Sequence, residues 1–277
     1  MTKARIEARF AALKAENRAA FIAYVMAGDP DAATAAQILK GLPAAGADLI
    51  EVGFPFSDPM AEGPPIQKAA QRALASGMTL TKTLAAVAEF RKGDDATPVI
   101  LMGYANPLVG WGFEAFARDA AAAGVDGLIV VDIPPEEADP LADALDAYDL
   151  SLIRLATPTT DDARLPIVIR RTSGFVYYVS VAGVTGVKEA EADVVAPNVQ
   201  RVRAASGLPV AVGFGIKTPE RAAAIARVAD AAVVGSALVE EVATSLAMNE
   251  SVTERVLSKV NSLAKAVRSA RVESLTV

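Results

Sequence analysis

The chain has 277 residues, of which 52% are hydrophobic and 5% aromatic, and its formal net charge is −6. This length suffices for one large α/β domain or two small ones, and the negative charge argues against a nucleic-acid or anionic-membrane surface. The chain has no cysteine and no histidine, which excludes disulfides, thiol nucleophiles, Cys-type zinc sites, histidine-ligated metals and Ser-His-Asp catalysis within it.

The two ends of the chain differ in their predicted order. Residues 1–15 are charged and amphipathic, and we expect a helix that lies on the fold. This segment lacks the apolar core and cleavage site of a secretory signal, and no apolar run approaches the length of a membrane span. A cytoplasmic protein is therefore expected. Residues from about 270 to 277 are expected to fray.

Between these ends, strand-like and helix-like segments alternate. Eight apolar runs bounded by turn formers predict strands at 20–27, 48–54, 98–103, 127–133, 150–156, 174–180, 209–213 and 230–234. Helical spacing predicts helices at 31–45, 65–76, 80–91, 113–123, 136–147, 161–171, 194–206, 219–227 and 251–268, with a further short helix starting at Gly235-Ser236.

The strands are continuous apolar runs, which is typical of a parallel sheet covered by helices. Eight βα units in a chain of this length predict a single (β/α)8 TIM barrel over residues 1–277, with an extra N-terminal helix and a short extra helix after the eighth strand. A doubly wound sheet is the rival architecture. It is disfavoured because neither of the first two strands leads into a G-x-G-x-x-G helix start.

The active site of such a barrel lies where strands end and the following loops begin. The polar residues at these ends are Asp29, Glu51, Asn106, Asp132, Thr157 and Ser180. We expect Asp29 and Thr157 to shape turns, because each is next to a proline. No metal site is predicted in this chain.

Glu51 interrupts the apolar run of the second predicted strand, and a turn-rich loop carrying Asp58 and Glu62 follows it. A buried carboxylate is costly unless something satisfies it. In a chain without histidine, acid/base chemistry near neutral pH must use Asp, Glu, Tyr or Lys. Glu51 and a loop carboxylate could form an acid/base pair. The alternative is that Glu51 pairs with an arginine at a strand end and the loop is only a connection.

Glycine-bearing loops follow the last three predicted strands and read A-G-V-T-G, G-F-G-I-K and V-G-S-A. Glycine lets the backbone approach a ligand closely, and a helix N-terminus offers unpaired N–H groups to an anion. In this fold a phosphate often binds between the seventh and eighth loops and a short helix. The predicted phosphate donors are Gly186, Gly215, Gly235 and Ser236. The alternative is that these glycines only make tight turns.

Five segments together resemble the tryptophan synthase alpha subunit family: E-V-G-F-P-F-S-D-P-M-A-E-G-P, L-M-G-Y-A-N-P, G-L-I-V-V-D-I-P, V-A-G-V-T-G and G-F-G-I. The likeness runs in register from about residue 20 to residue 238. It implies a (β/α)8 barrel that cleaves indole-3-glycerol phosphate to indole and glyceraldehyde 3-phosphate by a retro-aldol reaction. Neither a cofactor nor a Schiff-base lysine in this chain is implied.

The resemblance assigns roles to individual residues. It implies that Glu51 shuttles a proton between the glycerol hydroxyl and indole C3, and that Glu62 engages the indole N–H. The positions that match the family's indole pocket are Tyr24, Met102, Tyr104, Ile129, Leu155, Tyr177, Thr185 and Phe214. Each of these could instead be ordinary barrel packing. There are two departures from the family: Glu62 stands where Asp is usual, and Val181 where Arg is frequent.

The resemblance also implies a partner. The family works with a beta subunit that binds pyridoxal phosphate and joins indole to serine, in an αββα tetramer. Asp58, Asn106 and Pro134 would lie at that interface, and the loops carrying Asp58 and following Val181 would order on binding.

Alternatives to this lyase subunit stay open. One is a self-sufficient lyase, and another is a non-catalytic regulatory barrel that tunes a partner. A third is another phosphate-binding barrel, such as a sugar-phosphate isomerase, which the lack of histidine and of a catalytic-lysine pattern disfavours.

Overall fold

A closed barrel of eight parallel strands forms the centre of the molecule, and strand order around it follows the chain. The structure is a computed structural model that describes residues 3–180, 192–213 and 215–271. Each strand pairs with the next in sequence, and β8 closes the barrel against β1. The strands are β1 (Ala20–Met26), β2 (Leu49–Gly53), β3 (Val99–Gly103), β4 (Gly127–Val130), β5 (Ser151–Ala156), β6 (Val176–Val179), β7 (Val210–Gly213) and β8 (Ala231–Val234). The predicted (β/α)8 fold is confirmed.

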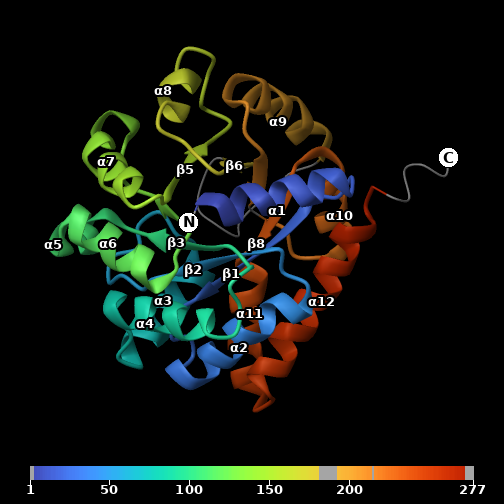
Figure 1. Cartoon of the computed structure of the whole chain (residues 1–277). Coiled ribbons are helices and arrows are strands. Elements are labelled where there is room, and N and C mark those ends of the chain that lie inside the picture. Colours follow the sequence, from blue (N-terminus) through green and yellow to red (C-terminus); the bar gives the residue numbers. More distant parts are fainter. Residues whose placement is uncertain (1–2, 181–191, 214, 272–277) are drawn as a thin grey trace.

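Helices surround the barrel as an outer ring (Figure 1). They are α1 (Lys3–Ala15), α2 (Ala32–Ala45), α3 (Pro64–Ala75), α4 (Leu80–Arg91), α5 (Ala105–Trp111), α6 (Phe113–Ala123), the 3-10 turn η1 (Pro135–Glu137), α7 (Asp139–Ala147), α8 (Leu165–Ile169), α9 (Ala192–Ser206), α10 (Pro219–Val228), α11 (Ser236–Met248) and α12 (Val252–Ser269). No helix in these described ranges is long and apolar enough to cross a membrane.

Helix boundaries correct the sequence prediction in four places, and proline explains three of them. The sequence prediction has no helix at the position of α5, in which Pro107 lies in the first turn, where a proline costs no hydrogen bond. Pro140 and Pro166 likewise lie at the first turns of α7 and α8, so these helices begin later than predicted. Helix α11 is longer than predicted, because no breaker precedes Asn249, whose left-handed conformation ends it.

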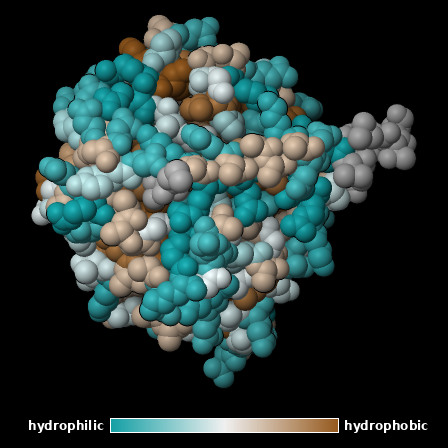
Figure 2. Space-filling view, viewed as in Figure 1, coloured by the Kyte–Doolittle hydropathy of each residue, from teal (hydrophilic) through white to brown (hydrophobic). Residues whose placement is uncertain are grey.

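The interior of the barrel and its outer face hold separate apolar clusters. Along β2, Leu49 faces the interior, whereas Ile50 and Val52 face the helices. Helix α1 lies across the end of the barrel where the strands begin (Figure 1) and inserts Phe10 and Leu13 into the interior cluster. Figure 2 shows that the face beside α1 is mostly hydrophilic, with hydrophobic residues in scattered groups. Helix α1 therefore closes the end of the barrel interior where the strands begin, and the interior opens at the end where the strands finish.

Three aspartates, which directly precede β2, β4 and β8, stabilise the closed end through hydrogen bonds and ion pairs. Each carboxylate accepts a hydrogen bond from the N–H of a residue near the start of the preceding strand, and each also pairs with at least one arginine. The sets are Asp48 with Phe21 and Arg18, Asp126 with Val99, Arg5 and Arg91, and Asp230 with Val210 and Arg203. Buried backbone donors at this end are thus satisfied by side chains.

Candidate active site

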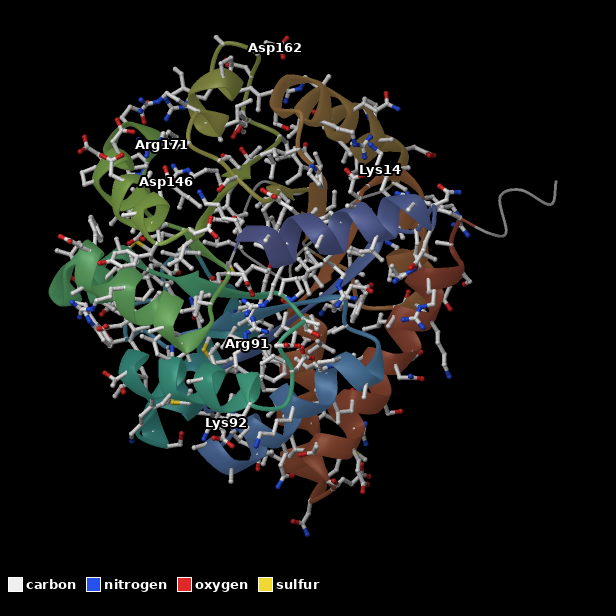
Figure 3. All side chains as sticks on the ribbon, viewed as in Figure 1. Lys14, Arg91, Lys92, Asp146, Asp162 and Arg171 are labelled. Carbon is white, nitrogen blue, oxygen red and sulfur yellow. The ribbon has the colours of Figure 1, made fainter. Side chains whose placement is uncertain are left out.

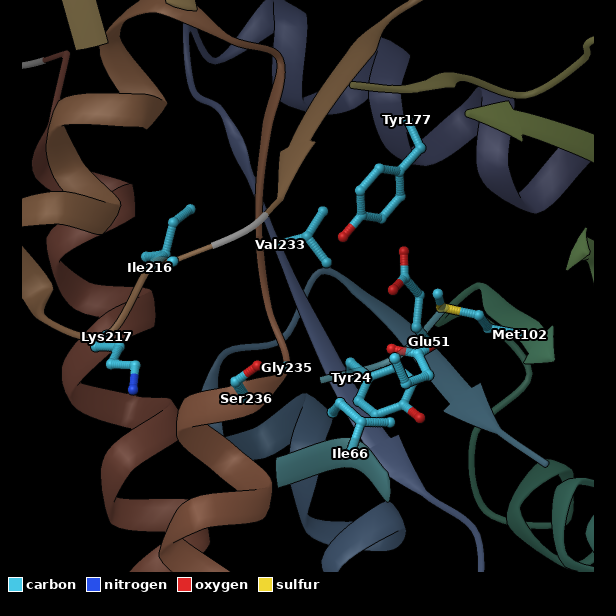
Figure 4. A pocket seen from close by; sticks show the side chains of 12 residues that line it. Tyr24, Glu51, Ile66, Met102, Tyr177, Ile216, Lys217, Val233, Gly235 and Ser236 are labelled. Carbon is cyan, nitrogen blue, oxygen red and sulfur yellow. The ribbon is translucent and has the colours of Figure 1, made fainter. Parts of the chain in front are cut away.

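A cavity opens at the end of the barrel where the strands finish, with an empty volume of about 520 Å³ including its open mouth. Ligand sites in proteins typically have this size and this place in the fold. Figure 4 shows Glu51 and Tyr177 on one side of the cavity and Ser236 and Lys217 on the other. The described residues that line it are Tyr24, Glu51, Glu62, Ile66, Met102, Tyr177, Gly215, Ile216, Lys217, Val233, Gly235 and Ser236.

Glu51 is the central residue of β2 and points into the barrel, because Ile50 and Val52 on either side face outward. Its side chain is buried, and its Oε1 has no hydrogen-bond partner among the described residues. Burial raises the pKa of Glu51 to about 8, and the nearby charge of Glu62 adds to the effect. The alternative prediction, an arginine partner, is wrong for the described part of the chain. Glu51 is therefore mostly protonated at neutral pH.

Two tyrosines flank Glu51. Tyr24 is its register partner on β1, and Tyr177 comes from β6 with its hydroxyl pointing toward the carboxyl group (Figure 4). Burial, together with the two carboxylates, raises the pKa of each tyrosine well above its ordinary value, so both stay neutral. Each hydroxyl fits against a glycine. A Cβ on Gly53 would lie 2.2 Å from the Tyr24 hydroxyl, and one on Gly213 would lie 1.9 Å from that of Tyr177.

Glu62 reaches the same cavity from the loop after β2. It is 6% exposed, and its backbone carbonyl accepts a hydrogen bond from the Gln67 side chain in the first turns of α3. Gly63 caps that helix and Pro64 begins it, so the loop passes directly into α3. The fold thus brings together the two carboxylates that the sequence singled out.

The opposite side of the cavity is built from the loops after β7 and β8. Gly215 has a positive φ of 74°, which favours glycine. Gly235 caps α11 and Ser236 is its first residue, so unpaired N–H groups of the helix lie at the cavity wall. The Lys217 ammonium lies 3.0 Å from a carboxylate oxygen of Glu240. This side can receive an anion, as the sequence predicted.

The other predicted ligand residues are distributed around the barrel. Met102 lines the cavity and Ile129 is buried in the interior cluster, against which Leu155 packs. Tyr104 lies beside Glu62 in a smaller adjoining space rather than in the main cavity. Thr185, Gly186 and Phe214 lie outside the described residues, as does Val181.

The predicted partner residues are all exposed: Asp58 is in the loop after β2, Asn106 in α5 and Pro134 in the loop after β4. Of the strand-end residues, Asp29 lies in a turn after β1, as predicted, and its N–H donates to the Met26 carbonyl at 3.2 Å. Its buried carboxylate forms two hydrogen bonds with Arg72. Thr157 shapes a turn, in which its N–H and hydroxyl bond to Thr160.

Sequence reasoning missed four cavity residues: Ile66, Ile216, Lys217 and Val233. Lys217 carried a signal, because it follows the G-F-G-I segment directly. Ile66 carried none, since a single apolar residue in the first turn of α3 looks like any other core position. In the described parts of the chain, no group of three or more acidic residues is arranged to hold a metal ion.

Fold and site together define a class: a (β/α)8 barrel whose cavity has a buried carboxyl pair on one side and a glycine-lined helix start on the other. The family model of the tryptophan synthase alpha chain matches residues 10–268. The chain belongs to this family, which confirms the resemblance seen in its sequence motifs.

Individual relatives and solved structures support the same family assignment. The tryptophan synthase alpha chain of Phenylobacterium zucineum is 78% identical over 271 residues, which are 98% of each chain. That of Caulobacter vibrioides strain NA1000 is 74% identical over 272 residues, covering 98% of this chain and 99% of the relative. Among solved structures, the alpha subunit from Legionella pneumophila strain Paris has a TM-score of 0.89 at 40% identity, covering 95% of this chain and 98% of that one.

Proposed function

We propose that this chain is the alpha subunit of a tryptophan synthase and cleaves indole-3-glycerol phosphate to indole and glyceraldehyde 3-phosphate. The observation that carries the proposal is Glu51. It is a buried carboxyl group with a pKa raised to about 8, in a cavity that it shares with Glu62. A group that must give and take a proton in one cycle works best with a pKa near the working pH.

In the proposed reaction, the neutral Glu51 carboxyl gives its proton to C3 of the indole ring. The resulting carboxylate then takes the proton of the hydroxyl on the adjacent glycerol carbon. The carbon–carbon bond between that carbon and the ring breaks, its electrons return to the ring, and the hydroxyl carbon becomes the aldehyde. Glu51 ends neutral, as it began, so no proton is gained or lost overall.

Glu62 has the complementary role. Protonation at C3 places positive charge on the indole nitrogen, and a carboxylate facing the ring N–H stabilises that charge. The ring nitrogen itself accepts the electrons that drive bond cleavage, so we propose that the chain needs no cofactor of its own. Glutamate in place of the family's usual aspartate keeps the charge and adds one methylene, and we expect the loop to sit farther back.

The substrate phosphate would bind at the far side of the cavity. Gly215, Gly235 and Ser236 offer backbone N–H groups there, and Lys217 adds a cation. The apolar lining between the two sides, which includes Ile66 and Val233, suits an indole ring.

We further propose that a beta subunit with pyridoxal phosphate receives the indole, in an αββα tetramer. Asp58, Asn106 and Pro134 would contact it. In support, two large apolar side chains near them are exposed at this end of the barrel: Met60 by 76% and Val109 by 61%. Exposed apolar side chains next to a cavity mouth are typical of a binding surface. The cytoplasmic location stays a prediction.

The test is indole release from indole-3-glycerol phosphate by the wild-type chain and Glu51→Gln, each with and without a cognate beta subunit. The surface change Glu89→Gln on α4 is the matched control. We expect release that rises with the partner, falls by at least about a thousandfold in Glu51→Gln, and is unchanged in Glu89→Gln.

Other outcomes would identify the alternatives. Fast release without the partner would favour a self-sufficient lyase. No release under any condition, with the partner still stimulated, would favour a regulatory barrel and contradict the proposed catalysis.

A further inference from the structure

One tyrosine hydroxyl lies under the loop that carries Glu62. The backbone N–H of Ala61 donates a hydrogen bond of 2.9 Å to the Tyr104 hydroxyl. The next N–H, that of Glu62, donates to the Pro59 carbonyl within the loop at 3.1 Å. The Tyr104 ring stacks on Phe56 at the start of the loop, with ring centroids 5.3 Å apart and an interplanar angle of 29°. A single side chain therefore holds both the beginning and the end of this loop.

Tyr104 is itself held from the next loop around the barrel. It directly precedes α5, and the first N–H of that helix, from Ala105, donates to the Asp132 carboxylate at 2.8 Å. Asp132 lies just beyond β4. The carbonyl of the following residue, Ile133, accepts a hydrogen bond of 2.9 Å from the guanidinium of Arg154 on β5.

Arg154, the donor of this last hydrogen bond, is unusually buried for an arginine. It is only 6% exposed, although it lies on a barrel strand, and its second terminal nitrogen has no partner among the described residues. Three hydrogen bonds, joined through the backbone of neighbouring residues, thus connect β5 with the loops after β4, β3 and β2. The last of them ends at the amide of Ala61, directly before Glu62.

We propose that Tyr104 is a positioning residue for Glu62, supported from behind by Asp132. This inference rests on the proposed function of Glu62. A carboxylate on a loop can stabilise developing charge only if the loop backbone is fixed, since a misplacement of about 1 Å can cost about a hundredfold in rate. The hydroxyl fixes the amide of Ala61, the residue directly before Glu62, and so sets the direction in which the Glu62 side chain leaves the loop.

The first test is kinetic. Tyr104→Phe keeps the ring that stacks on Phe56 and removes only the acceptor oxygen. We expect kcat for indole release to fall by about tenfold to a hundredfold, with KM for indole-3-glycerol phosphate changed by less than about threefold. Tyr148→Phe, at the end of α7 and away from the cavity, is the matched control and should leave both constants unchanged.

A double-mutant cycle separates positioning from direct substrate contact. In the Glu62→Gln background, Tyr104→Phe should cost less than about twofold in kcat, because the group that it positions is already lost. If the two losses multiply instead, the hydroxyl acts independently of Glu62 and the inference is overturned. Asp132→Ala should show the same non-additivity with a smaller loss.

The second test does not depend on activity. Hydrogen exchange followed by mass spectrometry should show faster exchange of the Ala61 amide in Tyr104→Phe, with exchange in α12 unchanged. Unchanged exchange at the loop would overturn the inference. If the wild-type chain released no indole, the proposed function would fail, and the exchange experiment would still decide whether Tyr104 fixes the loop.

Discussion

The two ends of the barrel differ in the partners that they give to a buried carboxyl group. At the closed end, Asp126 accepts hydrogen bonds from the Arg5 and Arg91 side chains and from the Val99 N–H, and its side chain is fully buried. At the open end, Glu51 is just as buried, yet its Oε1 has no hydrogen-bond partner in the described structure. Burial is thus the same at the two ends, and the partners differ.

This difference separates structural from chemical roles. A carboxylate that is fully paired satisfies the backbone and the arginines around it. Burial raises the pKa of Asp126, but its bonds to Val99, Arg91 and Arg5 oppose that rise. A carboxyl group left without a charge partner is neutral near pH 7 and can exchange a proton with a ligand. Among the described residues, the only buried carboxyl oxygen without a hydrogen-bond partner is that of Glu51 beside the cavity.

The largest effect on folding should come from the closed end. Asp126→Asn removes the negative charge between two arginines, and breaking a buried ion pair in this way costs about 3–5 kcal/mol. Urea denaturation measures the loss. Indole release per folded molecule should be unchanged, since Asp126 lies at the other end of the barrel.

Asp146→Asn is the matched control for this change. Asp146 on α7 pairs with Lys3 of α1 and with Arg171, but its side chain is 54% exposed. Figure 3 shows Asp146 and Arg171 side by side at the rim, whereas Arg91 lies near the middle of this face. Exposed pairs contribute at most about 1 kcal/mol. Equal losses in the two variants would contradict the distinction between them.

Removing the buried carboxyl group at the open end should have the opposite effect on stability: it should stabilise the fold. The folded-state pKa of Glu51 is about 8, against an ordinary value of 4.5. Between these two values the folded chain holds a proton that the unfolded chain has lost. Glu51 therefore destabilises the fold progressively as pH rises from about 4.5 to about 8, and the effect is constant above that.

Glu51→Gln removes this titration. We expect the variant to gain stability relative to wild type as pH rises from 5 to 9, by up to roughly 4 kcal/mol, while it loses activity. Urea denaturation at pH 5, 7 and 9 measures the gap, and Glu89→Gln should show no such trend over this range. A gap that is independent of pH would mean that Glu51 titrates as an ordinary carboxyl group.

Much of this contrast could be predicted from the sequence. The barrel followed from eight apolar runs that alternate with helix-like segments, and Glu51 was conspicuous because it interrupts the apolar run of its strand. Arg154 escaped notice, although it too interrupts an apolar strand. Its partner, the Ile133 carbonyl, lies in another loop, and sequence spacing carries no information on a contact between a side chain and a distant backbone group.

The proposed positioning role of Tyr104 could not be predicted from the sequence either. Its motif placed it among the pocket residues, but its contact with the amide of Ala61 depends on how the loop after β2 folds back over β3. Two helix starts were misplaced for a local reason. The predicted helices at 136–147 and 161–171 run through Pro140 and Pro166, whereas each proline lies in the first turn of a helix that begins later.

The smallest predicted effect concerns the charge at the far side of the cavity. Arginines crowd the closed end, but of the described residues that line the cavity only Lys217 is a cation. It pairs with Glu240 at 3.0 Å and is 38% exposed, so a phosphate group could share its ammonium without displacing a buried ion pair. Lys217→Met should raise KM for indole-3-glycerol phosphate by about tenfold, equivalent to about 1.4 kcal/mol, with kcat unchanged.

Two comparisons make this prediction specific. Lys92→Met, on the exposed end of α4, removes the same charge from the surface and should leave KM unchanged. The KM of the wild-type chain should rise with ionic strength more steeply than that of Lys217→Met, because the charge that salt would screen is gone in the variant. A KM that stays at the wild-type value in Lys217→Met would show that the lysine serves only Glu240, and that the backbone N–H groups of Gly235 and Ser236 hold the phosphate without a cation.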